Sequence, residues 1–133
     1  MDLRDKLKDM KILLIDDDEW IRDSLSRFFE YEACAFLALE TAEQGLEELK
    51  RKEYDIILLD YRLPGMNGVQ FLKQIQETHP HVMKILITAY GNKEVFSQAI
   101  ELGVGDFIDK PFSTKTLEDT LLRLIEEREQ GNS

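Results

Sequence analysis

The chain has 133 residues, a formal net charge of −10 and a single cysteine, Cys34. This length provides for one domain with one core, and a lone cysteine excludes a disulfide framework within the chain. The acidic balance argues against direct binding to nucleic acid, because phosphate contacts need clustered lysine and arginine.

The amino-terminal segment is charged throughout and does not resemble a signal peptide. No apolar stretch of the chain approaches the ~20 residues that span a bilayer. We therefore expect a cytoplasmic protein without membrane association. Residues 1–10 are interpreted as an N-terminal extension with one short amphipathic turn.

Short apolar runs recur along the chain and predict the strands. Each run has the length of a strand and lacks the polar alternation of a half-exposed strand, so the runs suit a sheet covered on both faces. In chain order they are Lys11–Ile15, Cys34–Ala38, Asp55–Leu59, Val82–Ile87 and Asp106–Ile108.

Segments with helical periodicity lie between these runs and predict amphipathic helices. Thr41 and Gln44 have the spacing of a capping box, and Gly103 is placed to end the fourth helix. The apolar stripes are Ile21, Leu25, Phe28 and Phe29; Ala42, Leu46 and Leu49; Phe71, Leu72 and Ile75; Val95, Phe96, Ala99 and Ile100; and Leu117, Leu121, Leu124 and Ile125.

Strict alternation of strands and helices predicts an α/β fold with parallel strands and right-handed crossovers. The natural arrangement is a doubly wound five-stranded parallel sheet of order 2-1-3-4-5, flavodoxin-like, with helices on both faces. In such sheets, ligands bind beyond the carboxyl ends of the strands. The residues that end each run are therefore the candidates for chemistry.

Polar residues stand at four of these ends. The first run is followed by Asp16, Asp17 and Asp18, the third by Asp60, the fourth by Thr88, and the fifth by Asp109 and Lys110. Each has an ordinary explanation as a helix cap, a turn residue or a solvated lysine. Taken together they are harder to explain in this way, because helix caps do not require carboxylates from separate strands to converge.

Converging carboxylates point to a bound cation. Two carboxylates ~4 Å apart repel by roughly 1 kcal/mol in water and by ~4 kcal/mol at an effective dielectric constant of about 20. A divalent cation relieves this repulsion, and few hard oxygen ligands suit Mg²⁺. A magnesium site with an ammonium group beside it is equipped for phosphoryl transfer, in which positioning and charge neutralisation supply most of the catalysis.

The motifs that carry these residues are "KILLIDDDEWIR", "YDIILLDYRLPGMNG", "ILITAYG" and "GVGDFIDKPF". Together they resemble the receiver domains of two-component response regulators. The resemblance runs from about Lys11 to Arg128, so that residues 11–128 are the expected domain and residues 129–133 a C-terminal tail. It implies a phosphorylation-activated switch that changes its output face, with Mg²⁺ as the cofactor.

The resemblance also implies roles for the residues of the acid site. Asp60 is the expected phosphoacceptor, which takes the phosphoryl group from a phosphohistidine of a sensor kinase. Asp17 is the expected direct magnesium ligand, with Asp16 acting largely through a coordinated water. Asp60 and the backbone carbonyl of Arg62 complete the metal ligands, and Lys110 is the cation that holds the phosphoryl oxygens.

Further roles concern the response to phosphorylation. Thr88 is the expected switch hydroxyl, and Phe107 the aromatic side chain that rotates inward once Thr88 has moved. Arg62 and Tyr90 are expected to tune the lifetime of the aspartyl phosphate, because both are bulky enough to hinder an attacking water. The family has a cis peptide bond at the position of Lys110–Pro111.

The expected partners are a sensor histidine kinase or a phosphotransfer protein, together with an output partner or a fused output domain. A phosphorylation-dependent homodimer is a further expectation. Such a protein is not a conventional enzyme, although it catalyses its own phosphotransfer and autodephosphorylation. The sequence leaves open whether the chain is a stand-alone regulator or the receiver of a longer protein.

Two alternatives remain open at this point. A small phosphatase of the haloacid dehalogenase type would use Asp16 as nucleophile and Asp18 as acid, but Trp20 stands where that family has threonine or valine. An inert receiver-like interaction module is the other alternative. It is disfavoured because Asp60, Lys110 and the remaining site residues are all present.

Overall fold

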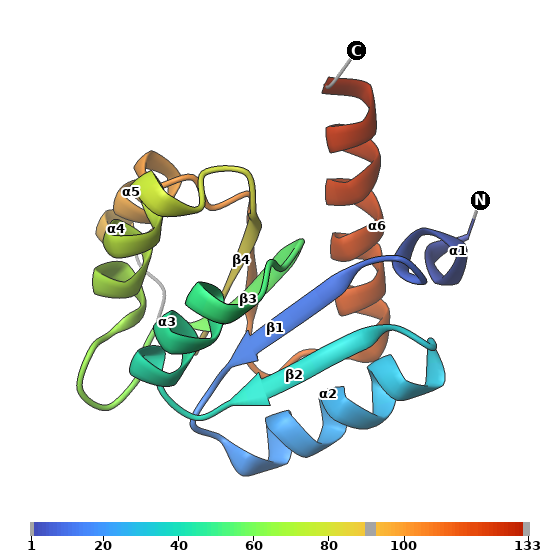
Figure 1. Ribbon diagram of the computed structural model, residues 1–133, viewed down its shortest axis with the longest axis horizontal. Coiled ribbons are helices and arrows are strands. Elements are labelled where there is room, and N and C mark those ends of the chain that lie inside the picture. The colour runs from blue at the N-terminus through green and yellow to red at the C-terminus, as the bar shows by residue number, and fades with distance from the viewer. Residues whose placement is uncertain (1, 90–92, 132–133) are drawn as a thin grey trace.

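The computed structural model describes residues 2–89 and 93–131, which form one parallel sheet flanked by helices (Figure 1). The strand order is β2-β1-β3-β4-β5, as predicted. The strands are β1 (Lys11–Ile15), β2 (Ala35–Leu39), β3 (Ile56–Asp60), β4 (Met83–Thr88) and β5 (Asp106–Asp109). The helices are α1 (Leu3–Leu7), α2 (Glu19–Tyr31), α3 (Ala42–Arg51), α4 (Gly68–Thr78), α5 (Lys93–Glu101) and α6 (Thr114–Gly131).

The strand ends differ from the prediction by one residue. β1 has the predicted bounds, but each of the other four strands ends one residue later than its apolar run. In three of these strands a polar end residue continues the backbone ladder: Asp60 pairs with Ile87, and Thr88 pairs with Asp109. In β2 the added residue is Leu39, which pairs with Ile15. Asp60 and Thr88 are thus the last residues of buried strands, which holds their backbones rigidly in place.

Alternate residues of the strands pack against two sets of helices. Ile12 and Leu14 of β1 face α1, α2 and α6, whereas Leu13 and Ile15 face α3, α4 and α5. Figure 1 shows these two layers on opposite sides of the sheet. The predicted stripes supply most of the helix contacts, but Ile100 of α5 is 60% exposed, so the fourth stripe is narrower than its spacing suggested.

The edge strand β2 departs from the expectation of a sheet covered on both faces. Every residue of the central strand β3 is buried, whereas no residue of β2 is fully buried. Among the described residues, β2 pairs only with β1, so no described strand lies along its outer edge. Apolar runs alone do not distinguish an edge strand from a central one.

The N-terminal extension contains the expected amphipathic turn, helix α1, which packs against α6. Leu7 is completely buried in the core, and Lys6 forms an ion pair with Glu129 (2.7 Å). Helix α6 continues to Gly131, beyond the expected start of the tail. Residues at both ends of the chain thus contribute to one layer.

Local hydrogen bonds fix the turns at the carboxyl edge of the sheet. Thr41 and Gln44 form the predicted capping box at the start of α3. In the loop after β3, Gly65 adopts a φ of +76°, a conformation in which side chains are unfavourable. A Cβ at Gly68 would lie 3.0 Å from the carbonyl oxygen of Asp60. The two glycines let this loop turn tightly against the end of β3.

Candidate functional site

Three carboxylates from the ends of β1 and β3 meet at the carboxyl edge of the sheet. Asp16, Asp17 and Asp60 each offer an oxygen, and these oxygens all lie within 4.8 Å of one another. Asp16 is completely buried and Asp60 is 5% exposed, whereas Asp17 faces solvent. Adjacent parallel strands, paired through Ile15 and Leu59, bring the three groups together.

Lys110, which follows β5, completes the cluster. Its Nζ lies 3.0 Å from Asp16 Oδ2 and 3.3 Å from Asp60 Oδ2. The backbone N–H of Lys110 donates to the carbonyl of Thr88 at 3.0 Å, which ties the loop to β4. The Lys110–Pro111 bond is cis, as expected. One ammonium therefore faces two of the carboxylates.

The electrostatics of the cluster reflect its burial. Desolvation and the charge of Asp16 raise the pKa of Asp60 to about 6, against the lowering effect of Lys110. Burial alone would lower the pKa of Lys110, but contacts with Asp16 and Asp60 outweigh it and leave that pKa raised. The lysine is firmly protonated, while the carboxylates hold more negative charge than one lysine neutralises.

Asp16 is held on several sides but keeps one oxygen without a hydrogen-bond donor. Its Oδ1 accepts from the backbone N–H of Asp18 (2.9 Å), and its own N–H donates to the carbonyl of Leu39 (3.0 Å). Within residues 2–89 and 93–131, no donor reaches Oδ2 with hydrogen-bond geometry, although the Lys110 ammonium is near. This oxygen pairs with the Lys110 ammonium by charge, and the all-oxygen donor set of the three carboxylates suits Mg²⁺.

The other expected site residues surround this cluster. Thr88 is 1% exposed and ends β4, next to the strand that ends in Asp60. The backbone N–H of Arg62 donates to Asp60 Oδ1 at 3.4 Å. Phe107 is half-buried in β5, and the centroid of its ring lies 4.6 Å from that of Phe96. Tyr90 lies outside the described residues.

Asp18 caps helix α2, which is one of the ordinary roles considered for the acids after the first run. Its Oδ1 accepts from the N–H groups of Trp20 (2.9 Å) and Ile21 (3.3 Å) at the start of α2. Asp18 is therefore the N-cap of α2, although it directly follows the acid pair in the sequence. A carboxylate in this position stabilises a helix start by hydrogen bonding and by its charge.

Arg22 lies beside the acid site, although the sequence pattern did not predict it as a site residue. Its Nη1 donates to the backbone carbonyl of Asp16 at 2.9 Å. One sequence feature could have predicted it: a positively charged residue stands in the first turn of α2, where the helix dipole disfavours positive charge. A cation there calls for a specific partner.

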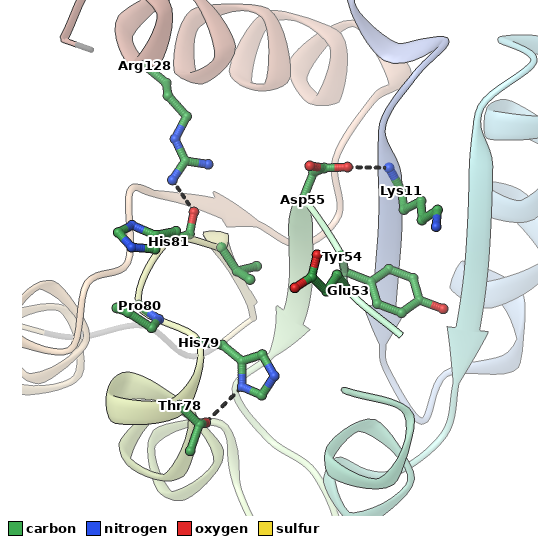
Figure 2. A pocket seen from close by; sticks show the side chains of 10 residues that line it. Lys11, Glu53, Tyr54, Asp55, Thr78, His79, Pro80, His81 and Arg128 are labelled. Carbon is green, nitrogen blue, oxygen red and sulfur yellow. Dashed lines mark hydrogen bonds between the residues drawn. The ribbon is translucent and has the colours of Figure 1, made fainter. Parts of the chain in front are cut away.

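Two cavities flank the sheet at opposite edges. A cavity of about 640 Å³ lies away from the acid site (Figure 2). It is lined by Lys11, Asp55 and Arg128, together with His79 and His81 from the loop between α4 and β4. His79 contacts Thr78 Oγ1 at 2.8 Å and the Leu49 carbonyl at 3.2 Å. Within the described part of the chain, neither histidine belongs to a group of three or more side chains placed to hold a metal ion.

A second cavity, of about 400 Å³, adjoins the acid site. It runs between α2 and the loop from β5 to α6, and its lining is mostly apolar. Trp20 on its rim is 75% exposed, and Lys110 and Pro111 form part of its wall.

None of the helices in the described ranges is both long and apolar enough to cross a bilayer. This agrees with the lack of long apolar stretches in the sequence.

Comparison with known proteins identifies related receivers. The chain is 34% identical over 113 residues to the response regulator protein FleR of Pseudomonas aeruginosa, covering 85% of this chain and 24% of FleR. A CheY-like receiver domain protein from Methanospirillum hungatei JF-1 superposes with a TM-score of 0.87 at 28% identity, covering 92% of this chain and 98% of that structure. The solution structure of the beryllofluoride-activated NtrC4 receiver domain dimer superposes with a TM-score of 0.81 at 32% identity. The match covers 88% of this chain and 97% of that structure.

The chain thus spans about a quarter of the length of FleR and nearly all of the two receiver structures. The family model for the response regulator receiver domain matches residues 12–122. Members of this family are signalling switches activated by phosphorylation, not conventional enzymes, and they interact with histidine kinases or phosphotransfer proteins. The chain belongs to the response regulator receiver domain family of two-component systems.

Proposed function

We propose that Asp60 is the phosphoacceptor of this switch. The observation that carries the proposal is the meeting of Asp60 with Asp16, Asp17 and Lys110 at one edge of the sheet. An oxygen of Asp60 would form a bond to phosphorus as the phosphorus–nitrogen bond of the donor's phosphohistidine breaks. The Lys110 ammonium, 3.3 Å from Asp60 Oδ2, is within reach of the transferred phosphoryl oxygens.

Mg²⁺ is the proposed cofactor, and when bound it would neutralise negative charge on the carboxylates and on the phosphoryl group. Asp17, the solvent-facing acid, would be a direct ligand, and buried Asp16 would act largely through a water. Asp60 and the carbonyl of Arg62 would supply the remaining protein ligands. The excess of three converging carboxylates over the single Lys110 ammonium supports a cation in this position.

Thr88 and Phe107 would carry the signal away from the site. The Thr88 hydroxyl is proposed to move towards the phosphoryl group, and Phe107 to rotate inward afterwards. Phe107 is half-buried and packs edge-on against Phe96, so its movement would alter the α5 side of the molecule. Arg62 and Tyr90 would set the lifetime of the phosphoryl group, and hence the rate of autodephosphorylation, by hindering water.

We further propose that residues 11–128 are the functional unit, with residues 1–10 and 129–133 as its extensions. The donor would be a sensor histidine kinase or phosphotransfer protein, and the reader an output partner or a fused output domain. The beryllofluoride-activated NtrC4 receiver is a dimer, which supports a phosphorylation-dependent homodimer here. We also propose that the protein is cytoplasmic. Its net charge of −10 argues against direct contact with nucleic acid or with an anionic membrane surface.

Neither alternative gains support from the comparisons. The hydrolase would need Asp16 as a nucleophile, yet Asp16 is completely buried and is held by Asp18 and Lys110. An inert module would have no need for three converging carboxylates, which repel one another.

The test is phosphorylation by acetyl phosphate with Mg²⁺, followed by intact mass and peptide mapping. We expect one phosphoryl group per chain, attached to Asp60 and absent from Asp60→Asn. Asp109→Asn is the matched control, because Asp109 also ends a strand but is exposed and lies outside the acid cluster. A phosphoryl group on Asp16 would favour the hydrolase, and no modification of the native chain would favour the inert module.

A further inference from the structure

Arg22 links three segments around the acid site. It lies in the first turn of α2, and its side chain is 17% exposed. Its Nη1 donates to the backbone carbonyl of Asp16 at 2.9 Å. Its Nη2 lies 3.4 Å from Oε1 of Glu40, in the turn between β2 and α3. One guanidinium thus joins the end of β1 to the following helix and to the neighbouring strand connection.

The carbonyl that Arg22 contacts belongs to the peptide group between Asp16 and Asp17. A peptide group is planar, so its carbonyl direction and the N–H direction of the next residue are fixed together. The N–H of Asp16 donates to Leu39, which holds the residue on the strand side. The contact with Arg22 holds the other side, from which the backbone leads to Asp17. Rotation of this peptide would turn Asp17 relative to the buried Asp16.

Glu40 in turn holds the guanidinium in place. The backbone N–H of Glu40 donates to Oε1 of Gln44 at 3.0 Å, so the capping box of α3 fixes the turn that carries Glu40. The planar fork of an arginine can serve a carbonyl and a carboxylate at once, which a lysine does less well. The helix dipole disfavours a cation at this position, and the two contacts offset that cost.

We propose that Arg22 is a positioning residue of the acid site, which orients the Asp16–Asp17 peptide and thereby sets the affinity for Mg²⁺. The inference rests on the metal site proposed above. Outer partners that orient metal ligands change metal affinity by roughly 10–100-fold when they are removed. Arg22 does not touch the phosphoryl group or the metal, and it acts through the backbone alone.

Calorimetric titration of the full chain with Mg²⁺ tests this directly. We expect Arg22→Ala to raise the dissociation constant about tenfold, and Arg22→Lys to restore part of the affinity. Arg27→Ala is the matched control, because Arg27 is exposed on the same helix, and it should leave the constant within about twofold of the native value. An unchanged or tighter constant in folded Arg22→Ala overturns the proposal.

A second measurement needs no metal and separates this inference from the proposed function. In Mg²⁺-free protein, the Asp16 and Asp18 amides are protected by bonds to Leu39 and to Asp16 Oδ1. Hydrogen exchange at both amides should accelerate about fivefold in Arg22→Ala, the factor expected from one lost hydrogen bond, and not in Arg27→Ala. Equal exchange in the two variants contradicts the role of Arg22, whereas failure of the native chain to bind Mg²⁺ contradicts the proposed metal site.

Discussion

At the scale of single residues, the site combines groups that are unfavourable on their own. Asp16 and Asp60 are buried side by side, and the only cation that the structure pairs directly with both, within its described residues, is Lys110. Burial of like charges costs stability unless a ligand compensates for it. The acid cluster is therefore expected to lower the free energy of unfolding of the ligand-free protein while it provides a binding site.

Replacement of Asp60 by asparagine should stabilise the Mg²⁺-free protein. The pKa of Asp60 rises from 3.8 to about 6, so its ionised form disfavours the fold above about pH 6, and this cost disappears below about pH 4. Such a shift corresponds to at most about 3 kcal/mol, and solvent screening leaves an expected gain of about 1–2 kcal/mol at neutral pH. Urea denaturation in EDTA measures it. Lower stability of the variant would show that the Lys110 contact outweighs the repulsion.

Asp17 and Asp18 are adjacent acids with different expected roles. Mg²⁺ at tenfold its dissociation constant should stabilise the native chain by about 1.4 kcal/mol. Asp17→Asn should lose this gain, whereas Asp18→Asn should keep it, because asparagine also caps helices well. Thermal unfolding with and without Mg²⁺ makes the comparison. Loss of the Mg²⁺ effect in Asp18→Asn, but not in Asp17→Asn, would reverse the assignment of the two acids.

At the scale of helices and strands, the sequence predicted the order and type of the elements because their apolar runs and stripes are long and regular. It missed the strand ends by one residue, because Asp60 and Thr88 continue the ladder through backbone bonds that side-chain polarity does not reveal. It also missed Arg22, since the contact depends on where a long side chain points. The acid cluster was predictable because its residues end neighbouring strands.

The loop after β3 depends on the close approach of Gly68 to the phosphoacceptor strand. A Cβ at this position would lie 3.0 Å from the carbonyl oxygen of Asp60 and 3.0 Å from the Cα of Tyr61, both backbone atoms. Gly68→Ala should therefore destabilise the protein by about 1–3 kcal/mol, although alanine is the better helix former by about 1 kcal/mol. Equilibrium urea denaturation measures the change. Equal or greater stability would mean that the loop relaxes freely.

At the scale of the whole molecule, residues outside the family match contribute to the core. Helix α1 precedes residue 12, where the match begins, yet Leu7 is completely buried against the layer that contains α6. The Lys6–Glu129 pair joins the two ends of the chain at the same place. The extension therefore adds to the stability of the domain. It lies away from the acid site, which is at the carboxyl edge of the sheet.

Truncation of Leu7 should separate stability from chemistry. Leu7→Ala should lower the free energy of unfolding by about 2–4 kcal/mol, the cost of a cavity in a packed core. Under conditions in which the variant is folded, its phosphorylation by acetyl phosphate should match that of the native chain. Lys8→Ala, an exposed neighbour, is the control and should change stability by no more than about 0.5 kcal/mol. A similar small effect for Leu7→Ala would mean that α1 is not part of the core.

The most direct test of the acid site as a phosphoryl-accepting centre is a crystal structure of the chain with Mg²⁺ and beryllofluoride. We expect the beryllium on an Asp60 oxygen, Mg²⁺ about 2.1 Å from oxygens of Asp17 and Asp60, and Lys110 Nζ against a fluorine. Beryllofluoride on Asp16, or a metal that does not contact Asp17 and Asp60, would contradict this assignment.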